Sequence, residues 1–459
     1  MRLWVYGQQL PEIQVAYTRL LYRLEFRSRD DNSTKPPIPD AGAMLRRNRT
    51  ATDVQSSNIV NFFSMLKKDD PREQLVYYQA GIGTYTIPQI AKPMMAKLHK
   101  VMDSMVGVHL NAHVMGGYEF LMQNYEAGDK ISLFGFSRGA YTARALAGMI
   151  HKVGLLPKCN HQQVPFAYKM YSREDETGWL QSSAFKKAFS IDVDIELIGV
   201  WDTVGSVGVI PKRLLFTTFN THVKHFRHAL ALDEHRVRFK PNFFNRPTHE
   251  EIELGLKWGE IPKVKASQPQ KSHRRKTLRE LERQYGHGGQ HQTDVEEVWF
   301  AGCHCNVGGG AVKNEIRNNL ARISLRWMVR ECFKLKTGIL FHRDTFKVIG
   351  MDPSTLWPEV KECPEPVTSF SDQPPPLTRP LPQVGVKTNS EDVSDFVSWW
   401  IMEYIPQKIW FQKDDDSWVR KLSINRGRGR IIPKQKIEGV KIHRTVQLRM
   451  GSLSVRTEG

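Results

Sequence analysis

The distribution of hydrophobic residues along the chain predicts short buried strands that alternate with helices. Four apolar, β-favouring runs each lead into a turn-rich segment: Leu75 to Gln79, Ile131 to Phe136, Ile195 to Trp201 and Glu297 to Gly302. Their hydrophobicity is nearly continuous, as expected for strands that helices cover on both faces. We therefore predict an α/β fold with a mostly parallel sheet, resembling that of the α/β-hydrolases, over residues 51–345.

The residues on either side of this region have weaker patterns. Residues 1–50 are predicted to be a partly disordered N-terminal extension, in which Ile13 to Phe26 has the spacing of a helix. Residues 346–459 are predicted to be an irregular C-terminal appendage. It contains a proline-rich linker at 364–390 and clustered aromatic residues near 394–412, which we interpret as a helix docked on the main domain.

The formal net charge of +18 would suit a polyanionic partner, but much of the excess lies in segments without a hydrophobic pattern. One of them is within 266–293, which we interpret as a flexible surface insertion. Another is Arg426 to Arg430, R-G-R-G-R, which we interpret as a solvated segment. Because the chain has no zinc-finger spacing, P-loop or aromatic RNA-recognition motif, we expect no specific nucleic-acid partner.

The composition, 40% hydrophobic and 25% charged, is typical of a soluble globular protein. No apolar run is long enough to span a bilayer, and the first residues do not have the apolar core of a signal peptide. The five cysteines are sparse and lack paired C-x-x-C spacing, which predicts reduced thiols and a cytoplasmic location. Cys303 and Cys305 are the one close pair and lack paired C-x-x-C spacing, so we expect no metal site there and predict no cofactor.

One serine stands where a predicted strand changes into a predicted helix. The pentapeptide G-F-S-R-G follows the run Ile131 to Phe136 and places Ser137 before apolar residues at helical spacing, which end at Gly154. In a G-x-S-x-G turn the serine is strained, and the glycines remove side chains that would clash. A helix N-terminus favours negative charge, so this position suits a nucleophile. A tight turn with an incidental serine is the alternative.

Two further strand ends supply the residue types that such a nucleophile needs. The third run ends at Asp202, and His304 follows the fourth. Because the carboxyl ends of parallel strands meet at one edge of a sheet, Ser137, Asp202 and His304 are predicted to lie together. The chain order Ser, Asp, His is that of the α/β-hydrolases.

Other interpretations of these residues stay open. Asp202 could form a turn, and His304 could be a buried core histidine. The rival bases are His228 and His235, in a stretch that looks helical, and the rival acid is Asp233.

Backbone N–H groups near Ser137 are candidates for holding an oxyanion. The first is that of Arg138, the residue after the serine. The glycine-rich segment after the first run, with Gly81 and Gly83, is a further candidate, although its glycines could serve only as turns.

The motifs GFSRGAYTARALAGMI, YYQAGIGTY, GVWDTVGSVG, FRHALALDE and WFAGCHCNVGGG together resemble a little-characterised α/β-hydrolase family that includes phospholipase effectors of the bacterial type VI secretion system. The resemblance covers residues 57–345 and, more loosely, 390–435, where SWWIMEYIP and GRGRIIP resemble uncharacterised fungal members. It implies a lipase or esterase fold with a triad of Ser137, Asp202 and His304.

The sequence departs from the family pattern in two places. Asn306 stands where members usually carry aspartate two residues after the histidine. The family also opens with an apolar strand that ends in Asp-Gly-Thr, and no such run lies between Arg49 and Ser57. The sheet is therefore predicted to lack one central strand.

Our primary hypothesis is a serine hydrolase that acts on carboxylic esters, including those of phospholipids, through an acyl-enzyme. The missing strand and Asn306 favour the alternative of a catalytically impaired, hydrolase-like interaction module. The basic charge and the segment with Trp399 and Trp400 also suggest peripheral contact with a membrane. The sequence does not indicate an oligomeric state.

Overall fold

The computed structural model describes residues 14–20, 56–79, 110–204, 216, 220, 222–237, 239–244, 281–282, 293–314, 316, 318–362, 403–412, 418–432 and 440–457. The strands are β1 (Gln14–Leu20), β2 (Gln74–Gln79), β3 (Lys130–Phe136), β4 (Ile195–Trp201), β5 (Val223–Ala231), β6 (Asp294–Phe300), β7 (Gln407–Gln412), β8 (Trp418–Ser423) and β9 (Lys441–Ile442). The helices are α2 (Asn58–Met65), α4 (Leu110–Asn124), α5 (Arg138–Val153), α6 (Val164–Ser172), α7 (Glu176–Phe189), α10 (His304–Gly308), α11 (Ala321–Lys334), α12 (Phe346–Ile349) and α14 (Arg444–Thr457). Short 3-10 turns occur at His161–Gln163, Arg343–Thr345 and Pro353–Thr355.

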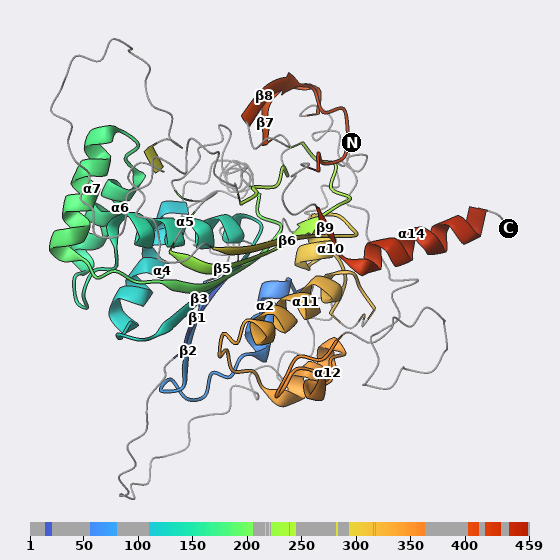
Figure 1. The fold of residues 1–459 in the computed structure, drawn as a ribbon, viewed down its shortest axis with the longest axis horizontal. Helices are drawn as coiled ribbons and strands as arrows, with labels where there is room; N and C mark the ends of the chain where they lie inside the picture. The colour runs from blue at the N-terminus through green and yellow to red at the C-terminus, as the bar shows by residue number, and fades with distance from the viewer. Residues whose placement is uncertain are drawn as a thin grey trace, which may run out of the picture.

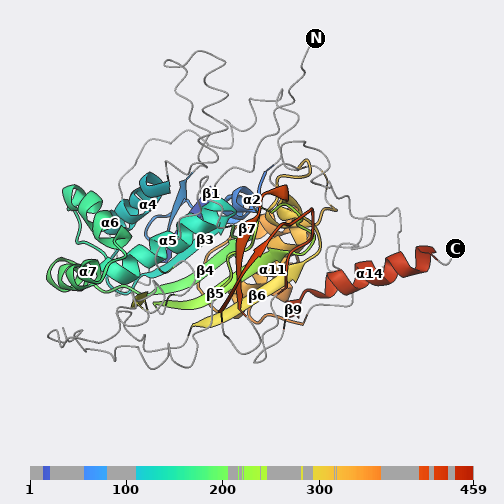
Figure 2. The ribbon, with the colours of Figure 1, turned by 90° about the horizontal axis from the view of Figure 1, so that it is seen from above.

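The described strands form one large sheet in the order β2-β1-β3-β4-β5-β6-β9, and β7 pairs with β8 in a separate hairpin (Figures 1 and 2). Neighbours from β3 to β9 are parallel, and only β1 runs against its neighbours in this sheet. The four apolar runs of the sequence coincide with β2, β3, β4 and β6. The predicted α/β fold with a mostly parallel sheet is therefore confirmed.

The place predicted to lack a strand is filled by β1. This strand pairs antiparallel with β3 on one side, where Gln14 stands opposite Phe136, and with β2 on the other, where Leu20 stands opposite Gln74. The helix predicted over Ile13 to Phe26 is therefore wrong for β1. Unpaired edges of β2 and β3 would leave backbone N–H and C=O groups without partners, and this tertiary demand outweighs a weak helical pattern.

Strand β5 also corrects the sequence analysis, because the stretch around His228 was interpreted as helical. His228 instead lies within β5, between β4 and β6 and fully buried. Ala and Leu have high helix propensity, but the run is buried on both sides, as a central parallel strand requires.

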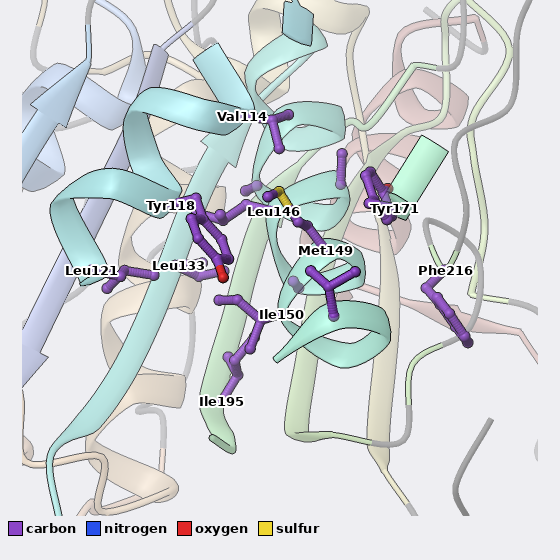
Figure 3. Packing of buried hydrophobic residues seen from close by; sticks show 14 of the residues in the cluster. Val114, Tyr118, Leu121, Leu133, Leu146, Met149, Ile150, Tyr171, Ile195 and Phe216 are labelled. Carbon is purple, nitrogen blue, oxygen red and sulfur yellow. The ribbon is translucent and has the colours of Figure 1, made fainter. Parts of the chain in front are cut away.

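Helices cover both faces of the sheet. On one face, α4, α5, α6 and α7 enclose a core of buried side chains, and on the other α2, α11 and α12 enclose a second core (Figure 1). Figure 3 shows the first core, where Tyr118 of α4 and Met149 of α5 lie near Leu133 of β3 and Ile195 of β4. Each large apolar side chain buried in this way contributes about 1.5–3 kcal/mol. This packing holds β3 and α5, which meet at Ser137, in a fixed arrangement.

Two predicted features outside the sheet differ from the structure. The aromatic helix expected near 394–412 is a strand at its C-terminal end, because β7 occupies Gln407–Gln412 directly after Pro406, which disfavours a helix at the residue before it. In the predicted surface insertion 266–293, Leu281 and Glu282 are buried, and Leu281 joins the first core. The linker 364–390 lies outside the described residues, and the domain boundaries stay a prediction.

No helix among the described residues is long and apolar enough to cross a membrane.

Candidate active site

The turn between β3 and α5 holds Ser137 in a strained backbone conformation. Its φ is 59° and its ψ is −124°, which residues other than glycine rarely adopt. The turn is tight enough that a Cβ at Gly135 would lie 2.6 Å from the backbone of Ala140. The N–H of Ser137 donates to the carbonyl of Trp201 at 3.0 Å, which ties the turn to the end of β4. Local sequence and strand pairing together fix the position of the hydroxyl.

The structure brings the three predicted side chains into contact at one edge of the sheet. The hydroxyl of Ser137 lies 2.8 Å from Nε2 of His304, and Nδ1 of His304 lies 2.5 Å from Oδ2 of Asp202. Ser137 follows β3, Asp202 follows β4, and His304 begins α10 shortly after β6. The serine is 2% exposed, and the other two side chains are fully buried. This geometry lets the serine donate to the imidazole, which donates in turn to the carboxylate.

Asp202 is held by more than the histidine. Its backbone is also strained, with φ 38°, and its Oδ1 accepts a hydrogen bond from the N–H of Ala231 at 3.0 Å. The guanidinium of Arg430 approaches both carboxylate oxygens, at 2.5 and 2.8 Å. Complete burial alone would raise the pKa of Asp202, but the charge and hydrogen bonds of Arg430 and His304 hold it below its ordinary value. The carboxylate is therefore ionised in the buried site.

The imidazole of His304 lies against two aromatic rings, and its backbone N–H contacts a buried ion pair. The rings of Phe136 and Phe239 have centroids 4.6 and 4.8 Å from that of His304. The backbone N–H of His304 donates to Glu234 at 3.2 Å, and Glu234 forms a bidentate pair with Arg236. Low polarity around the imidazole strengthens its contacts with charged partners.

Comparison with known protein families identifies the group to which this arrangement belongs. Residues 42–331, more than half of the chain, match the family described as T6SS, Phospholipase effector Tle1-like, catalytic domain. The chain belongs to this family. The resemblance inferred from the sequence motifs is therefore confirmed.

A curated relative of this chain comes from Saccharomyces cerevisiae and is described as an uncharacterised protein. The two are 30% identical over an alignment of 376 residues, which covers 62% of this chain and 55% of the relative. The chain thus matches about half of the length of that protein. No solved structure matches the chain.

The alternative candidates for the acid and the base, Asp233 and His228, form hydrogen bonds with groups outside the contact chain of Ser137, His304 and Asp202. Asp233 accepts the N–H of Gly302 at 2.6 Å. His228 accepts the N–H of Thr203 at 3.0 Å through Nε2, and its Nδ1 lies 2.8 Å from Glu297.

The other rival base, His235, contacts the carbonyl of Gly427 at 2.8 Å. Of the predicted oxyanion donors, Arg138 begins α5 directly after the serine, so its N–H belongs to the first turn of that helix. Gly81 and Gly83 lie outside the described residues.

The departure at Asn306 lies in α10, two residues beyond the histidine. Asn306 is 4% exposed and lines a cavity of about 30 Å³ together with Cys305, which gives space for about one water molecule. Over the part of the chain that the structure describes, no group of three His, Cys, Asp or Glu side chains could hold a metal ion.

Sequence reasoning missed two charged residues that contact Asp202 and His304. Arg430 was assigned to a solvated segment, yet its side chain is 3% exposed and lies against Asp202. Glu234 was passed over in favour of its neighbour Asp233. The available signal for Arg430 was the motif GRGRIIP, which shares its likeness to fungal proteins with the catalytic motifs although it lies far from them in the chain.

Proposed function

We propose that this chain is a serine esterase that hydrolyses the acyl ester bonds of lipids. The observation that carries the proposal is the chain of contacts from Ser137 through His304 to Asp202, with distances of 2.8 and 2.5 Å. Membership of a family named for phospholipase effectors supports a lipid as the substrate. A serine nucleophile paired with a histidine base is the arrangement typical of acyl transfer, which favours the carboxylic ester over the phosphodiester as the bond that is cleaved.

In the proposed reaction the oxygen of Ser137 attacks the acyl carbonyl carbon while Nε2 of His304 takes the hydroxyl proton. The tetrahedral intermediate then collapses, the bond to the leaving alkoxide breaks, and His304 returns the proton to that alkoxide. Water attacks the resulting acyl-enzyme with His304 again as base, which releases the fatty acid and restores the serine. Asp202 orients the imidazole and balances its positive charge in both steps.

The negative charge of the intermediate develops beside the start of α5. We assign one donor to the oxyanion, the N–H of Arg138, because it follows the nucleophile at a helix N-terminus. The assignments of Gly81 and Gly83 stay predictions.

A catalytically impaired interaction module is the second candidate, and the direction of β1 favours it. In the family pattern a parallel strand would end at the active edge and continue into the loop that supplies an oxyanion donor. Here β1 begins at that edge, since Gln14 pairs with Phe136. Loss of one oxyanion donor lowers turnover by roughly 10²–10³-fold.

A fluorophosphonate probe separates these candidates, because it reacts only with an activated serine. We expect the full-length protein to be labelled on Ser137 and the Ser137→Ala variant to remain unlabelled. The Ser132→Ala variant is the matched control, since Ser132 is equally buried on β3 but lies away from His304. It should be labelled like the wild type.

Phospholipid vesicles then test the substrate. The proposal predicts release of fatty acid and lysophospholipid, measured by mass spectrometry, and no release of a phosphorylated head group. Labelling that persists in Ser137→Ala would refute the nucleophile. A folded wild-type protein that takes no label and releases no fatty acid would favour the interaction module.

A further inference from the structure

Arg430 reaches the candidate active site from a part of the chain far outside the family match at 42–331. It closes the segment R-G-R-G-R at residues 426–430. Its Nη1 lies 2.5 Å from Oδ1 of Asp202 and its Nη2 lies 2.8 Å from Oδ2, so the two groups meet as a planar, two-point pair. Nη1 also donates to the carbonyl of Ala231 at 2.9 Å.

Polar contacts, one of them buried, join the segment that carries Arg430 to the loop after β5. Glu403, fully buried, accepts the N–H of Val237 at 2.6 Å and the N–H of Gly427 at 3.0 Å. Asn425 donates to the carboxylate of Glu403 at 2.7 Å and to the carbonyl of His235 at 3.0 Å. Two of these contacts, to the N–H of Val237 and the carbonyl of His235, join the segment to the loop, and the other two hold the segment together, so that Arg430 is brought to Asp202.

The contact with Arg430 fixes the orientation in which the carboxylate of Asp202 meets the imidazole of His304. Oδ2 of Asp202 accepts from Nδ1 of His304 and from Nη2 of Arg430, so the carboxylate plane is fixed from both sides. Without the guanidinium, the partners of the carboxylate among the described residues would be the N–H of Ala231 and the imidazole of His304.

The charged and titratable groups around Asp202 come from four places in the fold. They are His228 of β5, Glu234 and Arg236 after β5, His304 of α10, and Arg430 itself. Arg430 offsets one of the two buried carboxylates around the imidazole, and Arg236 offsets the other.

We propose that Arg430 is a positioning residue for the acid of the triad, supplied to the active site by the C-terminal segment. This inference rests on the proposed function, because it assigns Asp202 the role of orienting His304. Arg430 itself touches neither the serine nor the imidazole, so it acts through the carboxylate.

The experiment compares full-length Arg430→Gln with Arg428→Gln. Arg428 belongs to the same segment and carries the same charge, but it is exposed. We expect Arg430→Gln to lower kcat by about 100-fold, the loss expected when a catalytic group is misplaced by about 1 Å, with KM unchanged. We expect Arg428→Gln to match the wild type.

Two readouts separate positioning from a general structural effect. The acidic limb of kcat/KM against pH should move to higher pH in Arg430→Gln, because Asp202 would take up a proton more easily. Millimolar guanidinium should restore part of the rate of Arg430→Ala, since it can occupy the vacated place. Should Arg430→Gln fail to fold, Arg430→Lys keeps the charge without the two-point geometry and should give a smaller drop in kcat.

An Arg430→Gln variant with the kcat and pH profile of the wild type would overturn the proposal, as would an equal loss in Arg428→Gln. Failure of the proposed function would give a different result, because the wild-type protein itself would then show no turnover that depends on Ser137. That result would overturn the positioning role along with the function. The two variants would still differ in thermal stability, since the contact between Arg430 and Asp202 does not depend on catalysis.

Discussion

The nucleophile and the acid of the candidate triad are built in opposite ways. Ser137 is positioned by consecutive elements, because β3, the strained turn and α5 occupy Lys130–Phe136 and Arg138–Val153. Asp202 is positioned by partners 29, 102 and 228 residues away in sequence, which are Ala231, His304 and Arg430. The first arrangement is mainly local, with one bond from the N–H of Ser137 to the end of β4, and the second exists only when the whole chain has folded.

This difference has a physical consequence for the surroundings of Ser137, the nucleophile end, and for those of Asp202, the acid end. A local turn stores strain in the backbone, so it is sensitive to any added atom near the turn. A carboxylate held by remote charges depends on each partner side chain, because a buried charge that loses its partner is costly. The following changes test this contrast, from the largest expected effect to the smallest.

The largest effect is expected from removing the reacting groups themselves. Ser137→Ala and His304→Ala should each lower kcat by roughly 10⁶-fold, and the double variant should lose no more than either, because the two groups act as a unit. Esterase kinetics with a short-chain chromogenic ester measure all three. If the losses instead multiplied in the double variant, the two residues would not share one proton transfer.

At the nucleophile end, Gly135→Ala should destabilise the protein by about 3 kcal/mol. The added Cβ would lie 2.6 Å from the backbone of both Gly139 and Ala140, which cannot move without deforming the turn. Urea denaturation gives the free energy of unfolding. The control is Gly116→Ala in α4, where the nearest atom is a side-chain nitrogen at 3.4 Å, and where the change should be neutral or slightly stabilising.

At the acid end, stability should depend on pH through Asp202. Burial would raise the pKa of this carboxyl, but Arg430 and His304 lower it, so its stabilising effect is present above its ordinary value of 3.8 and is lost as the pH falls below it. In Arg430→Gln the folded-state pKa of Asp202 should rise, so the loss of stability below pH 3.8 should be shallower than in the wild type, whose slope reaches at most about 1.4 kcal/mol per pH unit. Urea denaturation between pH 3 and pH 7 measures it. Parallel profiles for the variant and the wild type would contradict the assignment.

The smallest effect is expected from the backbone of the C-terminal segment. Gly429 precedes Arg430, and a Cβ there would meet nothing closer than His235 at 3.7 Å. Gly429→Ala should therefore change the free energy of unfolding by less than about 0.5 kcal/mol and leave turnover unchanged. A loss comparable to that of Gly135→Ala would mean that the acid end also relies on a tight backbone turn.

The features that the sequence predicted correctly are those encoded over short distances. The runs that became β2, β3, β4 and β6 are continuous and apolar, and the helix after Ser137 ends at Gly154 as expected. The proximity of Ser137, Asp202 and His304, which are distant in sequence, was inferred from strand direction, and their catalytic roles stay a prediction.

The features that it missed depend on distant partners. Nothing within Gln14–Leu20 identifies it as the partner of β2 and β3, because strand pairing is decided by the edges that remain open. Arg430 looked like a solvated basic residue, since only the folded chain places a buried carboxylate beside it. Charge patterns alone cannot reveal such a pair.

The reversed strand β1 has a practical consequence for the design of shortened versions of this protein. A fragment cut at the limits of the family match, 42–331, would remove β1, the strand that joins β2 to β3 and to the rest of the sheet. It would also remove β9 from the sheet margin and Arg430 from its carboxylate. Cloning boundaries for this chain should therefore include residues 14–20 and extend past residue 442, whatever length the homologous region suggests.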